Sequence, residues 1–288
     1  MADRLIAAPS GRRLGLSTAG DPQADRLVLL CHPTPGSASF DPNPGVTERW
    51  GVHVVSLDRP GYGSSEPLPA DTLPSLKDRV EDVAGYLRQA TRSAETHTDD
   101  RDFVRLGVVG WGTGAAVALA FAATYGDRVD RLALVGAPAK RGLRKLARRA
   151  LIAPRSPAAL HVTDDDPDLA LPGLRGRLQR MVDDAFLQGK VGIDTDRVLM
   201  SDDFWVKRMG SVEAETVVLV GDRDPVADED DAAWYAKRLP HATVEVAVGS
   251  GPLAIATQWE RILAHVAPNH GSLPAEVRDH GAPRLPQQ

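Results

Sequence analysis

The chain has 288 residues and a formal net charge of −5 at pH 7, which argues against a general role in nucleic-acid binding. Its single cysteine, Cys31, excludes a disulfide framework and a cysteine metal cluster, and agrees with a reducing cytoplasm. The sequence has neither the ~18 apolar residues that span a bilayer nor an apolar signal-peptide core near its start. We therefore expect a cytoplasmic protein that binds neither nucleic acid nor a membrane.

Short apolar runs alternate with helical patterns along the first half of the chain. Such runs, bounded by Gly and Pro, are typical of strands that are buried on both faces. Their alternation with helices predicts the α/β class, with a mostly parallel central sheet flanked by helices. The expected strands are Leu27–Cys31, Val52–Leu57, Phe103–Val109 and Arg131–Gly136, and the expected helices are Leu76–Arg88 and Ala115–Tyr125.

Residues 138–212 interrupt this alternation. They contain a basic helical run, Lys140–Arg149, an acidic loop, Asp164–Asp168, and an amphipathic helical run, Leu174–Leu187. An insertion of this kind usually lies above the carboxyl ends of the strands, so we interpret it as a lid. The basic run is interpreted as a solvated face of the lid, with attraction of an anionic ligand or another protein as the alternative.

The alternation resumes after the insertion. Strands are expected at Thr216–Val220 and Thr243–Val248, and helices at Asp230–Leu239 and from about Pro252 to Val266. The chain is thereby divided into a core of residues 1–137 and 213–268, a lid of residues 138–212, and a tail of residues 269–288. The tail is rich in Pro, Gly, His and Gln, and we expect it to be disordered.

One pentapeptide in the middle of the core has the pattern of a catalytic turn. Gly110-Trp111-Gly112-Thr113-Gly114 has the glycine spacing of a nucleophile elbow, G-x-S-x-G, in which a strand-to-helix turn exposes a serine. An expected strand precedes it and an expected helix follows it, as that motif requires. The serine position, however, is Gly112, which carries no side-chain oxygen.

Two further motifs accompany the elbow. They are the loop His32-Pro33-Thr34-Pro35-Gly36-Ser37 and the turn Asp58-Arg59-Pro60-Gly61-Tyr62-Gly63. With these motifs the chain resembles the α/β-hydrolase superfamily over roughly residues 10–267, and it looks closest to small-molecule hydrolases with H-G-T-P-G-S, D-R-P-G-Y-G and G-x-S-x-G segments. The resemblance implies an α/β-hydrolase fold and a catalytic triad in the chain order nucleophile, acid, histidine.

The resemblance identifies one member of that triad in this sequence and the absence of the other two. Asp224, in Gly221-Asp222-Arg223-Asp224, stands where the family has its acid. Gly112 stands where the family has its serine, and Pro252 stands where it has its histidine. Glycine cannot attack an acyl group and proline cannot accept a proton, so we do not expect a Ser-His-Asp hydrolase.

The resemblance also implies an oxyanion hole with a ligand pocket beside it. The backbone N–H groups of Thr34 and Thr113 are the implied donors to a carbonyl oxygen or an anion. Pro33 and Trp111 are expected in the same pocket. We expect no substitute nucleophile, because the Thr113 side chain should point away from substrate and Cys31 should be a small buried residue.

We interpret the protein first as a pseudoenzyme that uses this pocket to bind a small molecule with a carbonyl or anionic group. The alternative is a non-hydrolytic enzyme, such as a lyase, cyclase, isomerase or decarboxylase of a natural-product pathway, with Asp224 or His32 as acid or base. Burial without a neighbouring histidine would raise the pKa of Asp224. Weak hydrolysis by bound water and a structural or partner-binding role with a collapsed pocket are further alternatives.

The remaining expectations concern histidines, cofactors and partners. His32 has the alternative role of holding its own loop by hydrogen bonds, and His161 of the lid could reach the pocket. No cofactor and no metal are expected. A homodimer or a protein partner is left open.

Overall fold

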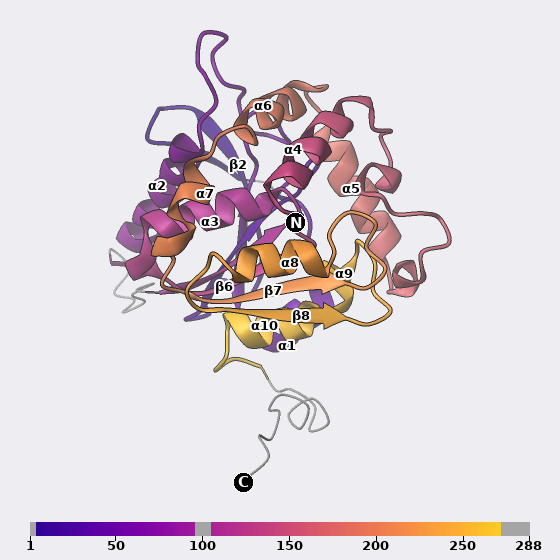
Figure 1. Ribbon diagram of the computed structural model, residues 1–288. Helices are drawn as coiled ribbons and strands as arrows, with labels where there is room; N and C mark the ends of the chain where they lie inside the picture. The colour runs from indigo at the N-terminus through magenta and orange to yellow at the C-terminus, as the bar shows by residue number, and fades with distance from the viewer. Residues whose placement is uncertain (1–3, 96–104, 272–288) are drawn as a thin grey trace.

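The computed structural model describes residues 4–95 and 105–271. Eight strands form one sheet in the order β1-β2-β4-β3-β5-β6-β7-β8. Figure 1 shows β7 and β8 side by side. β2 is antiparallel to both of its neighbours, β1 and β4, and every other neighbouring pair is parallel. The strands are β1 Arg4–Ala7, β2 Arg13–Gly20, β3 Leu27–Cys31, β4 His53–Leu57, β5 Leu106–Trp111, β6 Val129–Val135, β7 Glu215–Gly221 and β8 Ala242–Ala247.

The predicted mostly parallel sheet is confirmed, and β3 has the bounds expected from its apolar run. β5 begins at Leu106 and ends at Trp111, so it lies later in the chain than expected; residues 103 and 104 lie outside the described part. The antiparallel strands β1 and β2 were not predicted. Three of the four residues of β1 are exposed, and the apolar stretch of β2 is interrupted by Gly and Ser, so neither segment has the continuous apolar run from which a buried strand is predicted.

Helices cover both faces of the sheet. α2, α3, α7 and α8 contribute to the buried cluster on one face, and α1, α5 and α10 to the cluster on the other. The helices are α1 Pro44–Trp50, α2 Leu76–Glu95, α3 Gly114–Thr124, α4 Lys140–Arg149, α5 Leu174–Ala185, α6 Val191–Leu199, α7 Phe204–Arg208, α8 Glu229–Ala236, α9 Ala254–Thr257 and α10 Trp259–Val266. Within the described ranges, none of these helices is long and apolar enough to cross a membrane.

α1, α6 and α7 were not predicted, and two of the expected helices differ clearly from the structure. α2 continues to Glu95, seven residues past the expected end at Arg88. The expected last helix is two helices, α9 and α10, which are separated at Gln258. α3 is buried along nine of its eleven residues, which explains why its sequence is almost entirely apolar.

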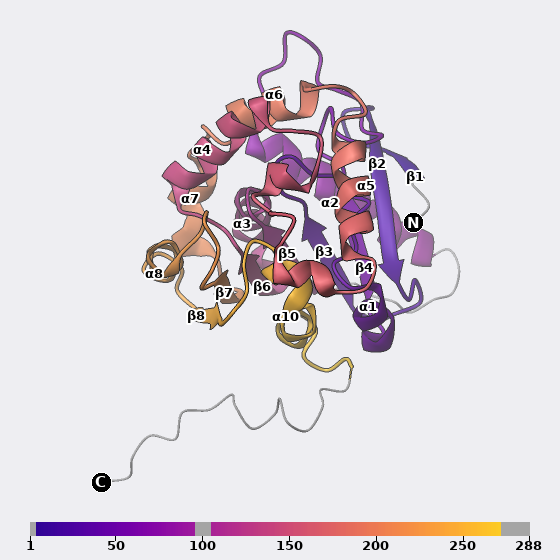
Figure 2. The ribbon, with the colours of Figure 1, turned by 90° about the vertical axis from the view of Figure 1, so that its right-hand side faces the viewer.

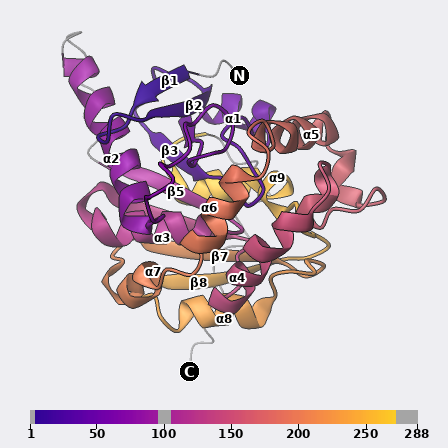
Figure 3. The same cartoon turned by 90° about the horizontal axis from the view of Figure 1, so that it is seen from above.

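Residues 138–212 connect β6 to β7 and add no strand to the sheet. We call this segment the insertion. It contains α4 to α7 and the short 3-10 helices at Ala150–Ile152, Pro157–Leu160, Pro167–Ala170 and Met209–Ser211; a fifth 3-10 helix, Gly126–Arg128, precedes β6. α4 and α6 lie side by side (Figures 2 and 3). Of the tail expected to be disordered, residues 272–288 lie outside the described part of the chain.

Candidate functional site

Three glycines build the turn from β5 into α3, and the structure favours glycine at these positions for different reasons. A β-carbon on Gly110 would stand 2.6 Å from the Cα of Ala115, and one on Gly114 would overlap the carbonyl oxygen of Cys31. These two positions are therefore fixed by the close packing of α3 on β5 and β3. The middle residue, Gly112, has a φ of +54°, in the left-handed region that favours glycine.

Space remains above Gly112. A β-carbon there would meet only the Cβ of Pro33, at 3.5 Å, which is an ordinary contact distance. The N–H group of Gly112 donates to the carbonyl oxygen of Val135 over 3.0 Å, so the turn is held from behind. At the tip of the turn, therefore, only backbone atoms border the open space above Gly112.

That volume is a pocket with about 390 Å³ of empty space, including its opening. Its walls come from the loops after β3, β5, β6 and β7, from the loop before α9, and from the insertion. The lining residues are Pro33, Thr34, Trp111, Gly112, Thr113, Gly136, Leu146, Ala159, Leu160, His161, Asp224, Val226 and Pro252. The structure therefore brings Asp224, Gly112 and Pro252 together with the four expected pocket residues, Pro33, Thr34, Trp111 and Thr113.

Thr34 and Thr113 are joined by their side chains. The Thr113 hydroxyl donates to the Thr34 hydroxyl over 2.7 Å, and both residues are buried. Thr113 precedes the first residue of α3, so its N–H group has no acceptor within that helix. Neither its N–H group nor that of Thr34 donates to an acceptor in residues 4–95 or 105–271. Two backbone donors at the pocket are thus available to a ligand oxygen.

Asp224 follows β7 and is partly buried. Its Oδ1 accepts hydrogen bonds from the N–H groups of Val226 at 2.8 Å and Ala227 at 3.4 Å. Burial raises the pKa of Asp224 to about 6, although these two N–H groups act in the opposite direction. Its Oδ2 lies close to Gly136, where a β-carbon would be 3.2 Å away. A carboxyl group with this pKa can both release and accept a proton near neutral pH.

Among the described residues that line the pocket, His161 is the one titratable side chain besides Asp224. It ends the 3-10 helix Pro157–Leu160 with a φ of +63°, and no other non-glycine residue of the described ranges has a positive φ. Burial lowers the pKa of His161, and the nearby charge of Arg149 lowers it further. The imidazole is therefore neutral at neutral pH. The lining residues include no serine and no cysteine.

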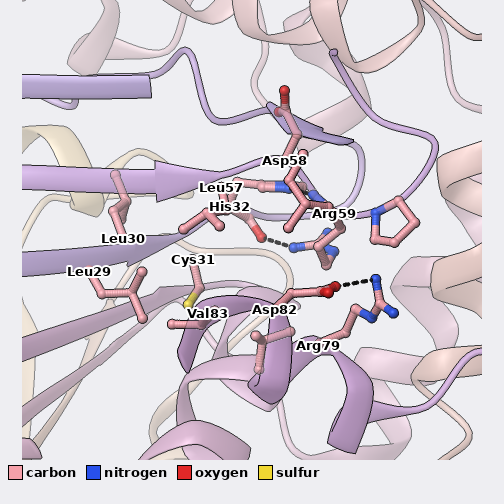
Figure 4. A pocket seen from close by; sticks show the side chains of 13 residues that line it. Leu29, Leu30, Cys31, His32, Leu57, Asp58, Arg59, Arg79, Asp82 and Val83 are labelled. Atoms are coloured by element: carbon pink, nitrogen blue, oxygen red, sulfur yellow. Dashed lines mark hydrogen bonds and ion pairs between the residues drawn. The ribbon is translucent and has the colours of Figure 1, made fainter. Parts of the chain in front are cut away.

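His32 lies elsewhere. It lines a second cavity, between β3 and α2, with Arg59, Arg79 and Asp82 (Figure 4). Its Nδ1 donates to the carbonyl oxygen of Pro33 over 2.9 Å, and its Nε2 accepts from the N–H group of Arg59 over 3.2 Å. Burial and the charge of Arg59 hold its pKa well below the usual range. Of the two roles considered for His32, this geometry favours holding the loop over acid–base chemistry in the pocket.

The loop that carries Pro252 is tied to the insertion. The N–H group of Gly251 donates to Oδ2 of Asp168 over 3.3 Å, and Asp168 is largely buried. Sequence reasoning missed this carboxylate, together with the buried Asp196 of α6. Both belong to the insertion, where a charged residue in a polar segment looks solvated unless its partner is known. In the described ranges, no cluster of three or more His, Cys, Asp or Glu residues could hold a metal ion.

The order of the elements and the position of the pocket can be compared with known proteins. Residues 45–251 match the family described as serine aminopeptidase, S33. The chain belongs to this S33 family of α/β-hydrolases. The superfamily and the fold predicted from the three sequence motifs are thereby confirmed. No curated protein sequence matches this S33 member.

Solved structures of the same fold are numerous. A bromoperoxidase from Bacillus anthracis is 19% identical, with a TM-score of 0.67 over 91% of this chain and 98% of its own. 2-Hydroxy-6-oxo-6-phenylhexa-2,4-dienoate hydrolase from Rhodococcus sp. is 22% identical, with a TM-score of 0.65 over 92% and 99%. An esterase from Exiguobacterium antarcticum is 18% identical, with a TM-score of 0.66 over 90% and 96%. At these identities the likeness shows the fold alone.

Proposed function

We propose that this S33 member binds a small molecule with a carbonyl or carboxylate oxygen, without forming a covalent acyl intermediate. The observation that carries the proposal is the open space above Gly112. It is bordered by Thr34 and Thr113, whose N–H groups donate to no acceptor in the described part of the chain, and no hydroxyl or thiol stands at the tip of the turn. The insertion, which supplies Leu146, Leu160 and His161 to the wall, serves as a lid.

The absence of an attacking side chain at residue 112 and of a histidine at residue 252 argues against serine-hydrolase chemistry. Gly112 has no attacking atom, and Pro252 occupies the loop where the resemblance places the histidine. The Thr113 hydroxyl is already committed to Thr34, and no histidine lies among its hydrogen-bond partners. In a serine protease, loss of the nucleophile or the base lowers turnover ~10⁶-fold. A fluorophosphonate probe should therefore leave the protein unlabelled.

Binding can be tested with acetophenone, benzoate and ethylbenzene by saturation-transfer NMR. The three molecules share a phenyl ring, but only the first two carry an oxygen that the N–H groups can bind. We expect signals from acetophenone or benzoate that exceed those of ethylbenzene and disappear in Gly112→Leu, whose side chain fills the space above the turn. Equal binding of all three, or binding that survives Gly112→Leu, would place the ligand elsewhere and refute the proposal.

A second candidate is acid–base catalysis by Asp224, which the raised pKa of this carboxyl favours. The probe is 5-nitrobenzisoxazole: a base removes its C3 proton, the N–O bond breaks, and a cyanophenolate forms without a covalent intermediate. The phenolate oxygen would be stabilised by the Thr34 and Thr113 N–H groups. We expect kcat/KM to rise with pH through about 6 as Asp224 ionises. Asp224→Asn should abolish this activity but leave acetophenone binding intact; an unchanged rate would exclude this candidate.

A further inference from the structure

Asp196 lies in the middle of α6 and is fully buried, with 0% of its surface exposed. Its two carboxylate oxygens accept hydrogen bonds from three core side chains. Oδ1 accepts from Nε of Arg59 at 2.9 Å, and Oδ2 accepts from Nη2 of Arg59 at 2.6 Å. Oδ2 also accepts from the hydroxyls of Tyr62 at 2.8 Å and Thr34 at 2.5 Å. The insertion therefore buries a charged group against the loop that carries Thr34.

Arg59 is the cation that balances Asp196, and it holds the same loop. Its Nη1 donates to the carbonyl oxygen of His32 over 2.6 Å (Figure 4), and its Nη2 donates to the carbonyl oxygen of Pro33 over 2.9 Å. Only 5% of the Arg59 side chain is exposed. Burial alone would lower the pKa of Arg59, but the charge of Asp196 and its hydrogen bonds act in the opposite direction, and the pKa is raised. A guanidinium this deep in the protein depends on its carboxylate partner.

Thr34 uses its hydroxyl completely. It donates to Asp196, and it accepts from Thr113 at 2.7 Å and from Nη2 of Arg59 at 3.1 Å. One hydroxyl offers one donor and two acceptor lone pairs, so no capacity is left for a ligand. The Thr34 side chain therefore links Asp196 to Thr113, and it fixes the two residues whose N–H groups are available in the pocket.

α6 is also seated closely on the turn that carries Arg59. A β-carbon on Gly192 would stand 2.6 Å from the Tyr62 ring, and one on Gly61 would stand 2.7 Å from the nitrogen of Gly192. This close packing places the α6 backbone against residues 61 and 62. The hydrogen bonds to Asp196 thus belong to a tightly packed contact between α6 and the core.

We infer that Asp196 is a positioning residue that sets the geometry of the carbonyl-binding N–H groups through Thr34. The insertion then has two effects on the pocket: it covers the pocket, and through Asp196 it holds the loop that carries Thr34. This inference rests on the proposed function, because it assumes that the Thr34 and Thr113 N–H groups bind an oxygen. Asp196 itself does not line the pocket. Its effect on a ligand is carried through Thr34 and Arg59.

A thiol at the tip of the turn makes the inference measurable without knowledge of the natural ligand. In Gly112→Cys, the thiolate attacks 4-nitrophenyl acetate; the bond to the leaving group breaks, and an S-acetyl cysteine and 4-nitrophenolate form. The carbonyl oxygen carries negative charge during the attack. Alkylation of the same thiol by iodoacetamide displaces iodide and develops no such charge. The ratio of the acetylation rate to the alkylation rate therefore reports oxyanion binding, with thiol pKa and access common to both reactions.

The test compares three variants in the Gly112→Cys background. Asp196→Asn removes the charge. Thr34→Val removes the hydroxyl that Asp196 holds, but keeps the backbone N–H and the Arg59–Asp196 pair, and so remains informative if Asp196→Asn does not fold. Tyr62→Phe is the matched control, because the Tyr62 and Thr34 hydroxyls donate to the same oxygen, Oδ2 of Asp196.

We expect the rate ratio in Gly112→Cys to exceed that of N-acetylcysteine by ~10²-fold, the order of effect of one oxyanion-hole donor. Thr34→Val and Asp196→Asn should lower the ratio by about tenfold or more, and Tyr62→Phe should change it less than twofold. If the ratio is high and neither Thr34→Val nor Asp196→Asn lowers it, the role of Asp196 is overturned and the carbonyl site stands. The same conclusion follows if Tyr62→Phe lowers the ratio as much as they do. A ratio no higher than that of N-acetylcysteine would instead refute the proposed carbonyl site.

Discussion

Pro33 and Gly112 face each other across the floor of the pocket, with 3.5 Å between the Cβ of Pro33 and the position of a β-carbon on Gly112. The spacing leaves room for a side chain at residue 112 without displacing the loop. The obstacle to a substitution there is the backbone conformation, because a φ of +54° is unfavourable for residues other than glycine.

Gly112→Ala should therefore fold with a free energy of unfolding that is lower by about 1 kcal/mol, the cost of a left-handed conformation for a residue with a β-carbon. Urea denaturation measures the difference. Gly114→Ala is the comparison, because its β-carbon would overlap the Cys31 carbonyl, and it should cost clearly more. Equal losses in the two variants would mean that the space above Gly112 is not open.

Gly112→Ser combined with Pro252→His should yield weak hydrolysis of 4-nitrophenyl acetate at most. The pair restores the residue types of a triad, but Asp224 directs its Oδ1 to the Val226 N–H, and the loop of Pro252 is fixed by Asp168. Gly112→Ala combined with Pro252→His is the control for background hydrolysis. Turnover of ~10 s⁻¹, the typical value for enzymes, would show that a complete triad geometry had been retained.

The stability of Asp224→Asn relative to the native protein should increase as the pH rises. The folded pKa of about 6 lies above the ordinary value of 3.8, so the unfolded chain releases this proton first. The contribution of Asp224 to the free energy of unfolding therefore falls as pH rises from about 4 to 6, and it stays low above that range. Between pH 4.5 and pH 8, the stability of the variant relative to the native protein should rise by about 2 kcal/mol.

Urea denaturation at the two pH values tests this sign and size. Asp230→Asn, at an exposed position of α8, serves as the control and should show no comparable change. A relative stability of Asp224→Asn that falls with rising pH would contradict the burial of an ionisable carboxyl in this wall.

His161→Gly should be more stable than His161→Ala by about 1 kcal/mol, because only glycine adopts a φ of +63° without strain. Both variants remove the imidazole from the pocket, so their difference isolates the backbone term. Chemical denaturation provides the measurement. Equal stabilities would imply that this segment of the insertion relaxes to another conformation.

Cys31 should not react with 5,5′-dithiobis(2-nitrobenzoate) at pH 8 in the folded protein. Burial raises its pKa to about 12, and only 7% of the surface of the residue is exposed. One thiol per chain should react after denaturation in guanidinium chloride. A reactive thiol in the native state would show that β3 opens. It would also mean that Cys31 reacts alongside the introduced thiol in the Gly112→Cys experiment.

Most residues of the candidate site could be predicted from the local sequence, because they lie in recognisable motifs that directly follow predicted strands. Gly112 and Thr113 follow β5, Thr34 follows β3 and Asp224 follows β7, and parallel strands bring their carboxyl ends to one edge of a sheet. His32 shows the limit of that reasoning. It belongs to the correct loop, but its ring nitrogens are used by Pro33 and Arg59, and it faces another cavity.

By itself, the amino-acid sequence determined the parallel part of the sheet, the elbow and the absence of an attacking side chain at residue 112, because these follow from apolar periodicity and residue identity over a few neighbouring positions. Only the tertiary structure decided that His161 and Asp224 share a pocket wall and that Asp196 is buried against Arg59 and Thr34. Asp196 and Thr34 are 162 residues apart. Their contact depends on how the insertion packs on the core, and no local pattern in either segment specifies that packing.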